Sequence, residues 1–341
     1  MKKKILVTGG TGYIGSHTAV ELINEGFDVV IIDNLYNSEK EVLNGIEKIT
    51  GTRPSLEVFD LCDNEKVIDF FSRNKDISAI IHFAAYKAVG ESVRKPLDYY
   101  RNNLVSLINL LEAMKKYSIP NLVFSSSCTV YGQPEKLPVT ENAPLQPAAS
   151  PYGNTKQVGE AIIRDTVFSD ENIKAVALRY FNPIGAHPSA LIGELPRGVP
   201  ENLVPYITQT AYGLRDELKV FGNDYDTPDG YCVRDYLHVV DLAKAHVVAV
   251  KRLTEGKNKS GYEVFNLGTG TGVSVLEAIH AFERATGVKL KYKVVDRRPG
   301  DIEKIWANPS YANAELGWKT VSTLDESMKT AWDWENHIRK K

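Results

Sequence analysis

The fold of this 341-residue chain is decided by the stretch Lys4-Ile-Leu-Val-Thr-Gly-Gly-Thr-Gly-Tyr-Ile-Gly15. The apolar run Ile5–Thr8 predicts a buried strand, and the glycines that follow it predict a tight turn into a helix. Gly9, Gly12 and Gly15 have the G-x-x-G-x-x-G spacing that lets a phosphate approach the backbone closely. The amide groups at the start of the helix would then hold the phosphates. The stretch therefore predicts a strand–turn–helix unit that binds a dinucleotide.

An acidic residue at the end of the next predicted strand supports this interpretation. Asp33 lies 18 residues beyond Gly15, close to the spacing of about 20 residues at which a ribose-binding acid follows such a turn. Its carboxylate can accept hydrogen bonds from both hydroxyls of an adenosine ribose and would repel a 2′-phosphate. Since a glycine-rich turn alone can be only a turn, Asp33 is the residue that favours dinucleotide binding, and it favours NAD over NADP.

Strand-like and helix-like segments alternate through the first 180 residues or so. The predicted strands are apolar on both faces, as expected of parallel strands covered by helices, and the predicted helices are amphipathic. This alternation predicts a doubly wound, Rossmann-type α/β sheet. The expected strands are Ile5–Thr8, Asp28–Asp33, Leu56–Phe59, Ala79–Phe83, Asn121–Ser125 and Ala175–Tyr180, and the expected helices are Tyr13–Glu25, Asn64–Asn74, Leu97–Tyr117 and Tyr152–Phe168.

The alternation stops after about Phe181, where Pro and Gly become frequent. We therefore expect a dinucleotide-binding domain over residues 1–181 and a smaller, mainly substrate-binding domain over residues 182–341. A helix and a strand expected at Asp241–Leu253 and Glu263–Leu267 indicate that the segment near 236–267 rejoins the first sheet. The second domain is thus predicted to be interleaved with the first.

Composition excludes several classes of protein. The 41 basic and 43 acidic residues give a net charge of −2, which predicts no nucleic-acid partner and no membrane binding. No apolar run approaches the roughly 18 residues of a membrane span. The apolar run after Lys2–Lys4 is too short for a secretory leader, and the three cysteines form no C-x-x-C pair. These features predict a cytoplasmic protein.

Neither a metal site nor an acyl-hydrolase site is predicted. No histidine pair has the H-E-x-x-H spacing of a zinc site. His238 and Asp241, three residues apart, are interpreted as a capped helix start rather than as ligands. Ser126 is not in a G-x-S-x-G motif, so an acyl hydrolase has little support.

A second motif points to proton transfer. Tyr152 and Lys156 are four residues apart on a predicted helix, which places them on one face. Tyrosine has an ordinary pKa near 10, so acting as a base near neutrality requires a neighbouring positive charge, which Lys156 can supply. Ser127 follows a predicted strand, at the edge where open α/β sheets bind ligands. An exposed helix with an ordinary lysine is the alternative interpretation of this pair.

Taken together, the motifs resemble those of the UDP-galactose 4-epimerase family, within the extended short-chain dehydrogenase/reductase superfamily. The resemblance spans about Lys4 to Trp334, and it departs from the family at Ala85, where glycine is common, and at Cys128, where alanine is frequent. Besides the glycine-rich turn, it is carried by His82-Phe-Ala-Ala-Tyr-Lys-Ala-Val-Gly-Glu-Ser92, Ser125-Ser-Ser-Cys-Thr-Val-Tyr-Gly132, Arg179-Tyr-Phe-Asn-Pro-Ile-Gly-Ala-His-Pro188, Phe221-Gly-Asn-Asp-Tyr225, Val233-Arg-Asp-Tyr-Leu-His-Val239 and Arg297-Arg-Pro-Gly-Asp301.

The resemblance implies an NAD-dependent isomerase acting on a UDP-hexose. Tyr152 would take the proton of the sugar 4-hydroxyl while C4 gives its hydride to NAD⁺. The 4-keto sugar would turn over, and the hydride would return to its other face. UDP-glucose and UDP-galactose are the expected pair, UDP-GlcNAc and UDP-GalNAc possible additional substrates, and a homodimer the expected assembly.

The resemblance also assigns residues by position. Catalysis is assigned to Ser127, Tyr152 and Lys156. NAD binding is assigned to Gly9, Gly12, Tyr13, Ile14, Gly15, Asp33, Asn34, Asn37, Ser38, Asp60, Leu61, Phe83, Ala84, Lys87, Asn102, Tyr152, Lys156 and Phe181. UDP-sugar binding is assigned to Lys87, Ser127, Tyr152, Tyr180, Asn182, Asn202, Leu203, Phe221, Arg234, Arg298, Asp301 and Ile305.

Two alternative functions and one alternative role stay open at this point. A nucleotide-sugar 4,6-dehydratase would share the fold but needs an acid beside Ser127, where the chain has Cys128 and Thr129. An NAD-binding sensor would not need Ser127, Tyr152 and Lys156 together. Ile305 stands where a family tyrosine tends to exclude a 2-acetamido group; it is interpreted either as a permissive wall of the sugar pocket or as a core residue.

Overall fold

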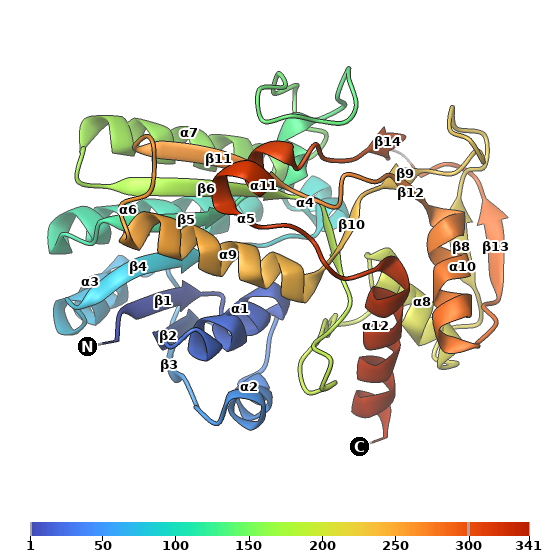
Figure 1. Ribbon diagram of the computed structural model, residues 1–341, viewed down its shortest axis with the longest axis horizontal. Helices are drawn as coiled ribbons and strands as arrows, with labels where there is room; N and C mark the ends of the chain where they lie inside the picture. Colours follow the sequence, from blue (N-terminus) through green and yellow to red (C-terminus); the bar gives the residue numbers. More distant parts are fainter. Residues whose placement is uncertain (1, 299–300, 341) are drawn as a thin grey trace. The chain divides into compact units, whose positions relative to one another are not determined.

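A parallel sheet organises the amino-terminal part of the protein, seen in a computed structural model that describes residues 2–298 and 301–340 (Figure 1). Its strand order is β11-β6-β5-β4-β1-β2-β3, and every pairing from β6 to β3 is parallel. The order reverses direction between β1 and β4, which is where doubly wound sheets bind ligands. The predicted fold class is therefore confirmed. The strands are β1 (Lys4–Thr8), β2 (Asp28–Asp33), β3 (Ser55–Val58), β4 (Ile77–His82), β5 (Asn121–Ser125), β6 (Lys174–Tyr180) and β11 (Tyr262–Leu267).

Helices cover this sheet because its strand side chains alternate between two faces and are apolar on both, so both faces must be shielded from water. One face packs against α3 (Asn64–Arg73), α6 (Ser106–Tyr117) and α7 (Pro151–Ser169). Phe70 and Phe71 of α3 are fully buried in that layer. The other helices of the doubly wound region are α1 (Tyr13–Asn24), α2 (Val42–Thr50), which was not expected, and α9 (Val239–Thr254).

The predicted helix Leu97–Tyr117 is helical along its whole length, but its first half contains a π turn that was not expected. The structure has a short helix α5 (Pro96–Tyr100), a π-helical turn η1 (Arg101–Val105) and only then α6. A π turn adds a residue to the helical repeat and often marks a functional site. The amphipathic periodicity continues through this turn, so the sequence pattern does not reveal it. A further short helix, α4 (Val89–Arg94), precedes α5.

The chain divides into two compact units. The first unit comprises the chain up to Gly132, then Leu145–Arg179 and Ala243–Phe265; the second comprises Gln133–Pro144, Tyr180–Leu242 and the chain from Asn266 onward. The break after Arg179 lies two residues before the boundary expected at residue 181, whereas the assignment of residues 133–144 to the second unit was not expected. Strand β11 lies beside β6 in the large sheet, as seen in Figure 1. Residues 133–144 belong to the second unit because Val139 exchanges backbone hydrogen bonds with Trp306 and Asn308.

The second unit has a core of its own. Ile279 and Phe282 of α10 and Met328 of α12 are fully buried in it. Both helices begin with a capping box, Ser274 with Glu277 and Thr323 with Glu326. The elements are β7 (Asn182–Ile184), α8 (Leu203–Ala211), β8 (Leu218–Phe221), β9 (Val233–Arg234), β10 (Tyr236–His238), β12 (Val273–Ser274), α10 (Val275–Thr286), β13 (Tyr292–Val295), β14 (Lys304–Ile305), α11 (Ser310–Leu316) and α12 (Leu324–Arg339).

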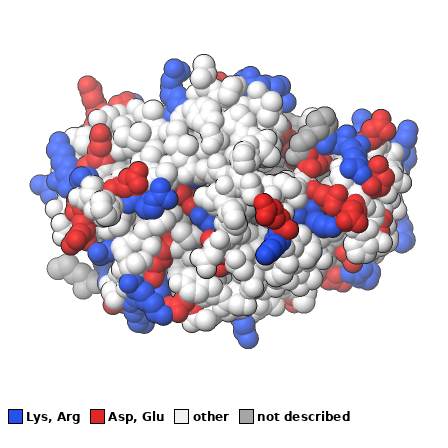
Figure 2. Space-filling model, turned by 90° about the horizontal axis from the view of Figure 1, so that it is seen from above, with Lys and Arg blue, Asp and Glu red and all other residues white. Residues whose placement is uncertain are grey.

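Two surface properties bear on the expected partners. Among the described residues on the face seen in Figure 2, acidic and basic side chains are interspersed. None of the described helices is long and apolar enough to cross a membrane.

Candidate active site

Glycines stand in and beside the turn between β1 and α1 at positions where a side chain would meet the backbone. Gly9 has a positive φ of 69°, and a Cβ there would lie 2.8 Å from the backbone nitrogen of Ala84. A Cβ on Gly15 would collide with the carbonyl oxygen of Gly9, and one on Gly12 would lie 3.2 Å from the same oxygen. The spacing of the three glycines therefore reflects close approach of backbone to backbone.

The start of α1 is left open to an anion. Its N-cap is Gly12, no side chain caps it, and its first turn holds no acidic residue. Amide groups and the helix dipole both favour negative charge at such an end. Lys87 adds a positive charge here, since its Nζ lies 5.9 Å from the centre of the Tyr13 ring. This geometry fits a pyrophosphate.

Asp33 organises the edge of the turn. Its carboxylate accepts hydrogen bonds from the Thr11 amide at 3.2 Å, from the Leu35 amide at 2.9 Å and from the Ser38 hydroxyl at 3.1 Å. It is buried, with 8% exposure. The side chain is therefore held at the carboxyl end of β2, beside the glycine-rich turn, where a ribose-binding acid is required.

The remaining NAD candidates of the first unit lie just beyond the carboxyl ends of β2, β3 and β4 or in the π turn. The Asn34 amide donates to the Asp60 carboxylate at 3.1 Å, which links the ends of β2 and β3. The Phe83 amide donates to the Thr8 carbonyl at 3.1 Å, which links the ends of β4 and β1. Ala84 faces Gly9, and Leu61 is buried. The sheet edge thus gathers Asn34, Asn37, Ser38, Asp60, Leu61, Phe83, Ala84 and Lys87, with Asn102 in η1.

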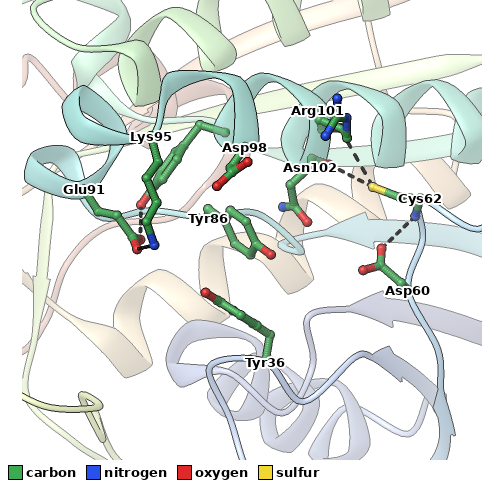
Figure 3. Close-up of a pocket in the computed structure, with 10 residues that line it drawn as sticks. Tyr36, Asp60, Cys62, Tyr86, Glu91, Lys95, Asp98, Arg101 and Asn102 are labelled. Carbon is green, nitrogen blue, oxygen red and sulfur yellow. Dashed lines mark hydrogen bonds and ion pairs between the residues drawn. The ribbon is translucent and has the colours of Figure 1, made fainter.

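A pocket of about 220 Å³ lies at this edge (Figure 3). It contains two predicted residues, Asp60 and Asn102. The rings of Tyr36 and Tyr86 lie 4.9 Å apart and face each other in Figure 3. The other lining residues, none of which was predicted from the sequence, are Cys62, Glu91, Lys95, Asp98, Tyr99 and Arg101. Cys62 alone had a sequence signal, its position in the loop just beyond a predicted strand end, whereas Glu91, Asp98, Tyr99 and Arg101 lie in helical elements.

Cys62 is an unreactive thiol in this pocket. Burial and the neighbouring Asp60 carboxylate raise its pKa to about 11. Its backbone amide donates to Asp60 at 2.8 Å, and its Sγ lies 3.7 Å from the Asn102 carbonyl oxygen in the π turn. A thiol with this pKa stays protonated at neutral pH and acts as a weak donor.

The three predicted catalytic residues come from two neighbouring elements. Ser127 follows β5 and caps the short 3₁₀ helix η2 (Cys128–Tyr131), its Oγ accepting from the Thr129 amide at 3.2 Å. Tyr152 and Lys156 lie on the first turns of α7, which begins after Ser150 and has Pro151 as its first residue. All three catalytic side chains belong to buried residues, with 5–8% exposure.

Lys156 is held in place by its partners. Its Nζ donates to the Ser125 carbonyl at 2.7 Å and lies 6.0 Å from the centre of the Tyr152 ring. Burial lowers the pKa of Lys156 to about 8, although the Glu160 carboxylate opposes the shift. The lysine is therefore close to its titration point at neutral pH, a property that often marks functional sites.

His82, at the end of β4, is buried beside Phe124, the ring that Lys156 also contacts. Its Nδ1 and the Thr8 hydroxyl are 2.8 Å apart, and its ring stacks on Phe124. Burial and the Lys156 charge lower the pKa of His82 to about 3. His82 is accordingly a neutral hydrogen-bonding group at physiological pH.

The second unit gathers some of the predicted sugar-nucleotide residues. Arg298 donates to the Asp301 carboxylate through Nε at 3.1 Å and Nη2 at 2.6 Å. Its guanidinium lies 5.5 Å from the centre of the Phe221 ring. These three residues therefore form one cluster. Pro299 and Gly300, between them in the motif, lie outside the described residues.

Arg234 and Ile305 are brought together by strand pairing. β14 pairs with β9 in parallel, with Ile305 in register with Arg234. The next residue, Asp235, is fully buried and accepts hydrogen bonds from Thr269 and Gly270 and from the amide of Ala307. This set of bonds fixes the backbone at the end of β9 and thus the position of the Arg234 Cα, from which the side chain extends.

The remaining predicted residues of the second unit lie in two places, and the Asn182 amide joins the first of these to the Arg234 cluster by donating to the Asp235 carbonyl at 2.9 Å. Tyr180 ends β6, Phe181 donates its amide to the Leu267 carbonyl, and Asn182 begins β7. Asn202 caps α8 and donates to Glu194 at 2.8 Å, and Leu203 is the first residue of that helix. Sequence reasoning assigned no role to Asp235, Glu160 or Arg179: Asp235 and Arg179 lie inside quoted motifs without being assigned as site residues, and Glu160 lies in none of them.

No described group of three or more His, Cys, Asp or Glu side chains is arranged to hold a metal ion. His238 Nδ1 accepts from the Val240 amide at 3.1 Å at the start of α9, and the Asp241 carboxylate accepts from the amides of Val321 and Ser322. Both side chains therefore have structural partners.

Comparison with known proteins gives consistent matches over the whole chain. The profile of the family described as GDP-mannose 4,6 dehydratase matches residues 6–331. The chain is 52% identical over 332 residues to the UDP-glucose 4-epimerase of Bacillus subtilis (strain 168), covering 97% of this chain and 96% of the relative. It is 50% identical over 341 residues to the human UDP-glucose 4-epimerase, covering 98% and 97%.

Solved structures agree with these relatives. The UDP-glucose 4-epimerase of Bifidobacterium longum in complex with NAD⁺ and UDP superposes with a TM-score of 0.94 at 47% identity, covering 99% of both chains. That of Stenotrophomonas maltophila, with bound NAD and formylated UDP-arabinopyranose, has a TM-score of 0.95 at 46% identity and the same coverage.

Proposed function

We propose that this chain, which belongs to the UDP-glucose 4-epimerase family of the extended short-chain dehydrogenase/reductases, interconverts UDP-glucose and UDP-galactose with NAD as its resident cofactor. The observation that carries the proposal is the placement of Tyr152 and Lys156 on α7, with Ser127 at the end of β5, in the unit that also holds the open glycine-rich turn. The Bifidobacterium longum relative binds NAD⁺ and UDP, which supports the same ligands here.

The residues of the first unit fit the cofactor. The glycine-rich turn and the open start of α1 suit its pyrophosphate, and Asp33 suits the adenosine ribose. Asp60 and Asn102 bring polar groups to the pocket at the neighbouring strand ends. When bound, NAD would supply a hydride acceptor for sugar C4 and would return the hydride to the 4-keto sugar after it has turned over.

The side chains around the reacting carbon would move and hold protons. Tyr152 takes the proton of the sugar 4-hydroxyl as the general base and gives it back in the second half of the reaction. Lys156, as a cation, stabilises the phenolate form of Tyr152. Ser127 donates a hydrogen bond to the same sugar oxygen, so that the oxygen stays aligned with Tyr152.

The nucleotide half of the substrate would be bound by the second unit. Arg234 and Arg298 can each meet diphosphate oxygens with two parallel hydrogen bonds. Arg298 is held by Asp301 and is 52% exposed, so it is both oriented and accessible. Asn182, Asn202, Leu203, Tyr180 and Phe221 complete the proposed contacts with the UDP-sugar. Most of the binding energy would come from the UDP half, which lies away from the reacting carbon. The sugar then needs few contacts of its own and stays free to turn.

The decisive experiment is incubation of the purified protein with UDP-galactose, without added NAD, followed by chromatography of the product. UDP-glucose should form without accumulation of free NADH. A stable keto-deoxy sugar would indicate a dehydratase instead. If no product forms, the NAD-binding sensor becomes the favoured function. Tyr152→Phe should keep the fold and the cofactor but lose roughly 10²–10⁴-fold in kcat. Near-normal turnover by this variant would refute the role of Tyr152.

We also propose that UDP-GlcNAc and UDP-GalNAc are accepted, less well than the unsubstituted pair. A relative from Campylobacter jejuni, 35% identical, is described as a UDP-Glc/GlcNAc 4-epimerase. Ile305 has no aromatic ring but is β-branched and stiff, and it lies in register with Arg234. It would therefore narrow the sugar pocket without closing it.

A homodimer in the cytoplasm is the proposed state of the protein. The first unit exposes apolar side chains on neighbouring short helices, Val93 at 61% and Leu97 at 74%, which a second copy of the chain would cover. The protein's three cysteines all lie in the described part of the chain and form no disulfide, in keeping with a reducing compartment.

A further inference from the structure

A buried glutamate lies one helical turn beyond the catalytic lysine. Glu160 follows Lys156 by four residues on α7, so the two side chains leave the same face of the helix. Glu160 is only 4% exposed. Its carboxylate accepts from the Ser126 hydroxyl at 2.5 Å and from Arg179 through Nε at 2.9 Å and Nη2 at 2.6 Å. The function proposed above gives this group no role.

Helix α7 holds the serine run at the end of β5 at two successive points. Lys156 donates to the carbonyl of Ser125, and Glu160 accepts from the hydroxyl of Ser126. The next residue is Ser127, the proposed hydrogen-bond donor to the sugar oxygen. The backbone amide of Ser126 also donates to the carbonyl of Leu178 at 3.0 Å. The Glu160 bond is therefore the side-chain link that ties the residue before Ser127 to the helix carrying Tyr152 and Lys156.

The charges around this carboxylate come from several elements. Arg179 on β6 pairs with Glu160 and also donates to the Tyr131 hydroxyl of η2 at 2.9 Å. Burial and the Glu160 charge raise the pKa of Tyr262 on β11, and Arg164 of α7 acts on the same phenol in the opposite direction. His82 on β4 feels the charge of Lys156 and is neutral at physiological pH. Among these groups, Glu160 is the anion that acts on Lys156.

We propose that Glu160 is a positioning residue of the proposed epimerase reaction, one that fixes Ser126, and through it Ser127, and keeps Lys156 in its cationic form. Two observations carry this proposal independently. The short bond to Ser126 gives the positional effect, and the four-residue spacing from Lys156 gives the electrostatic one. The proposal rests on the epimerase function, because only that reaction gives Ser127 and Lys156 their roles.

The electrostatic effect has a definite sign. Burial lowers the pKa of Lys156 to about 8, and the Glu160 charge is what opposes a further fall. If Glu160 becomes neutral, Lys156 loses its proton at a lower pH. The Tyr152 phenol then loses a neighbouring cation, so it ionises at a higher pH. Both changes shrink the population of the active form, which has a charged lysine and a phenolate.

The experiment is the pH profile of kcat/KM for UDP-galactose in Glu160→Gln. This substitution keeps the shape of the side chain and removes its charge. We expect the alkaline limb to move to lower pH by about one pH unit and kcat to fall roughly 10–100-fold. A second readout is the ultraviolet phenolate signal of Tyr152, taken as the difference from the same protein carrying Tyr152→Phe. Its midpoint should rise.

The chain offers a matched control. Arg252 and Glu263 form a second buried pair in the same unit, with bonds of 2.7 and 2.8 Å and side chains 7% and 4% exposed. Glu263→Gln breaks an ion pair of the same kind and burial but has no hydrogen bond to the serine run. It should lower the melting temperature without moving either limb of the pH profile. If both variants leave the profile unchanged, or move it equally, the proposal is overturned.

Two further variants separate the two effects. Ser126→Ala removes the bond to Glu160 and keeps the charge, so kcat should fall while the alkaline limb stays in place; an unchanged kcat would refute the positional effect. Glu160→Asp keeps the charge and should retain the wild-type limb. If Glu160→Gln does not fold, a shifted alkaline limb in Glu160→Asp would still refute the electrostatic effect. Failure of wild-type turnover would refute the proposed function instead, while the phenolate titration would still report on Glu160.

Discussion

At the scale of single residues, burial decides which form of a titratable side chain exists in this protein. His82 is an example, because it is held neutral by desolvation and by the Lys156 charge, and its Nδ1 is paired with the Thr8 hydroxyl. The same burial lowers the pKa of Lys156 only to about 8, which leaves that residue titratable near neutrality. Burial thus lowers the pKa of His82, a structural residue, far enough to keep it neutral, whereas the pKa of Lys156, a proposed catalytic residue, stays near neutrality.

His82 should make the protein sensitive to acid. Its pKa is about 3 in the folded state and near 6.5 in the unfolded chain. Between these values the unfolded state binds more protons, so the free energy of unfolding falls as the pH falls, by up to about 1.4 kcal/mol per pH unit. Urea unfolding at several pH values should show a flatter dependence over this window for His82→Asn than for wild type. Equal slopes would show that the histidine is not buried neutral.

Ile305 should set the preference between sugars. It is 2% exposed in β14, which also suits the alternative that Ile305 is only a core residue. One substitution distinguishes the two roles. If it walls the sugar pocket, Ile305→Tyr should reduce kcat/KM for UDP-GlcNAc relative to UDP-galactose by about 10–200-fold, the range expected for 1–3 kcal/mol. Activity on UDP-galactose is the internal control for folding. An unchanged ratio would assign Ile305 to the core.

At the scale of elements, two helices carry the proposed chemistry in different ways. Helix α1 contributes its backbone, because its start lies against Gly9 and has no side-chain cap. Helix α7 contributes side chains at intervals of four residues, Tyr152, Lys156 and Glu160, of which Lys156 and Glu160 bind the end of β5. The first depends on the absence of side chains, and the second depends on helical periodicity.

Gly15→Ala should therefore abolish cofactor retention. The added methyl group would collide with the Gly9 carbonyl oxygen and push α1 away from the turn. The NAD content of the purified protein, measured after denaturation, should fall to near zero. Gly26→Ala, just past the other end of α1, is the control: its φ is 84° and nothing lies near its Cβ, so it should lose stability by about 1 kcal/mol and keep its NAD. NAD retained by Gly15→Ala would contradict the proposed phosphate site.

At the scale of the whole molecule, the chain alternates between two compact units, which explains why the motifs are spread along the entire sequence. The first unit holds the glycine-rich turn and the proposed catalytic residues, and the second holds both arginines proposed to bind the diphosphate. The first unit also exposes apolar side chains on α4 and α5. An exposed apolar patch of this kind is typical of an interface.

Leu97→Glu should shift the protein from dimer to monomer. Leu97 is 74% exposed on α5, and a charge buried in an interface without a partner costs several kcal/mol. Light scattering coupled to size exclusion would measure the mass of each variant. Val321→Glu, at an exposed apolar residue of the second unit, should remain dimeric. A wild-type monomer, or a dimeric Leu97→Glu, would refute this interface.

Local sequence by itself determined the strands, the glycine-rich turn and the Tyr152–Lys156 pair. Each depends on neighbours within a few residues: β-branched runs extend, glycines permit close approach, and a four-residue spacing shares a helix face. The resemblance to a family added the positions in the second half, such as Arg298 and Ile305, where the periodic pattern is weak.

Tertiary structure alone decided the features that depend on distant residues. The pocket around Tyr36 and Tyr86 and the contact of Glu160 with Ser126 and Arg179 join segments that are far apart in the chain. The assignment of residues 133–144 to the second unit has the same origin. The π turn at Arg101–Val105 is local, but the amphipathic periodicity continues through it and does not reveal it. Propensity and periodicity report only on local backbone and on one face of an element, whereas burial, charge pairing and pKa depend on what the rest of the chain places against that face.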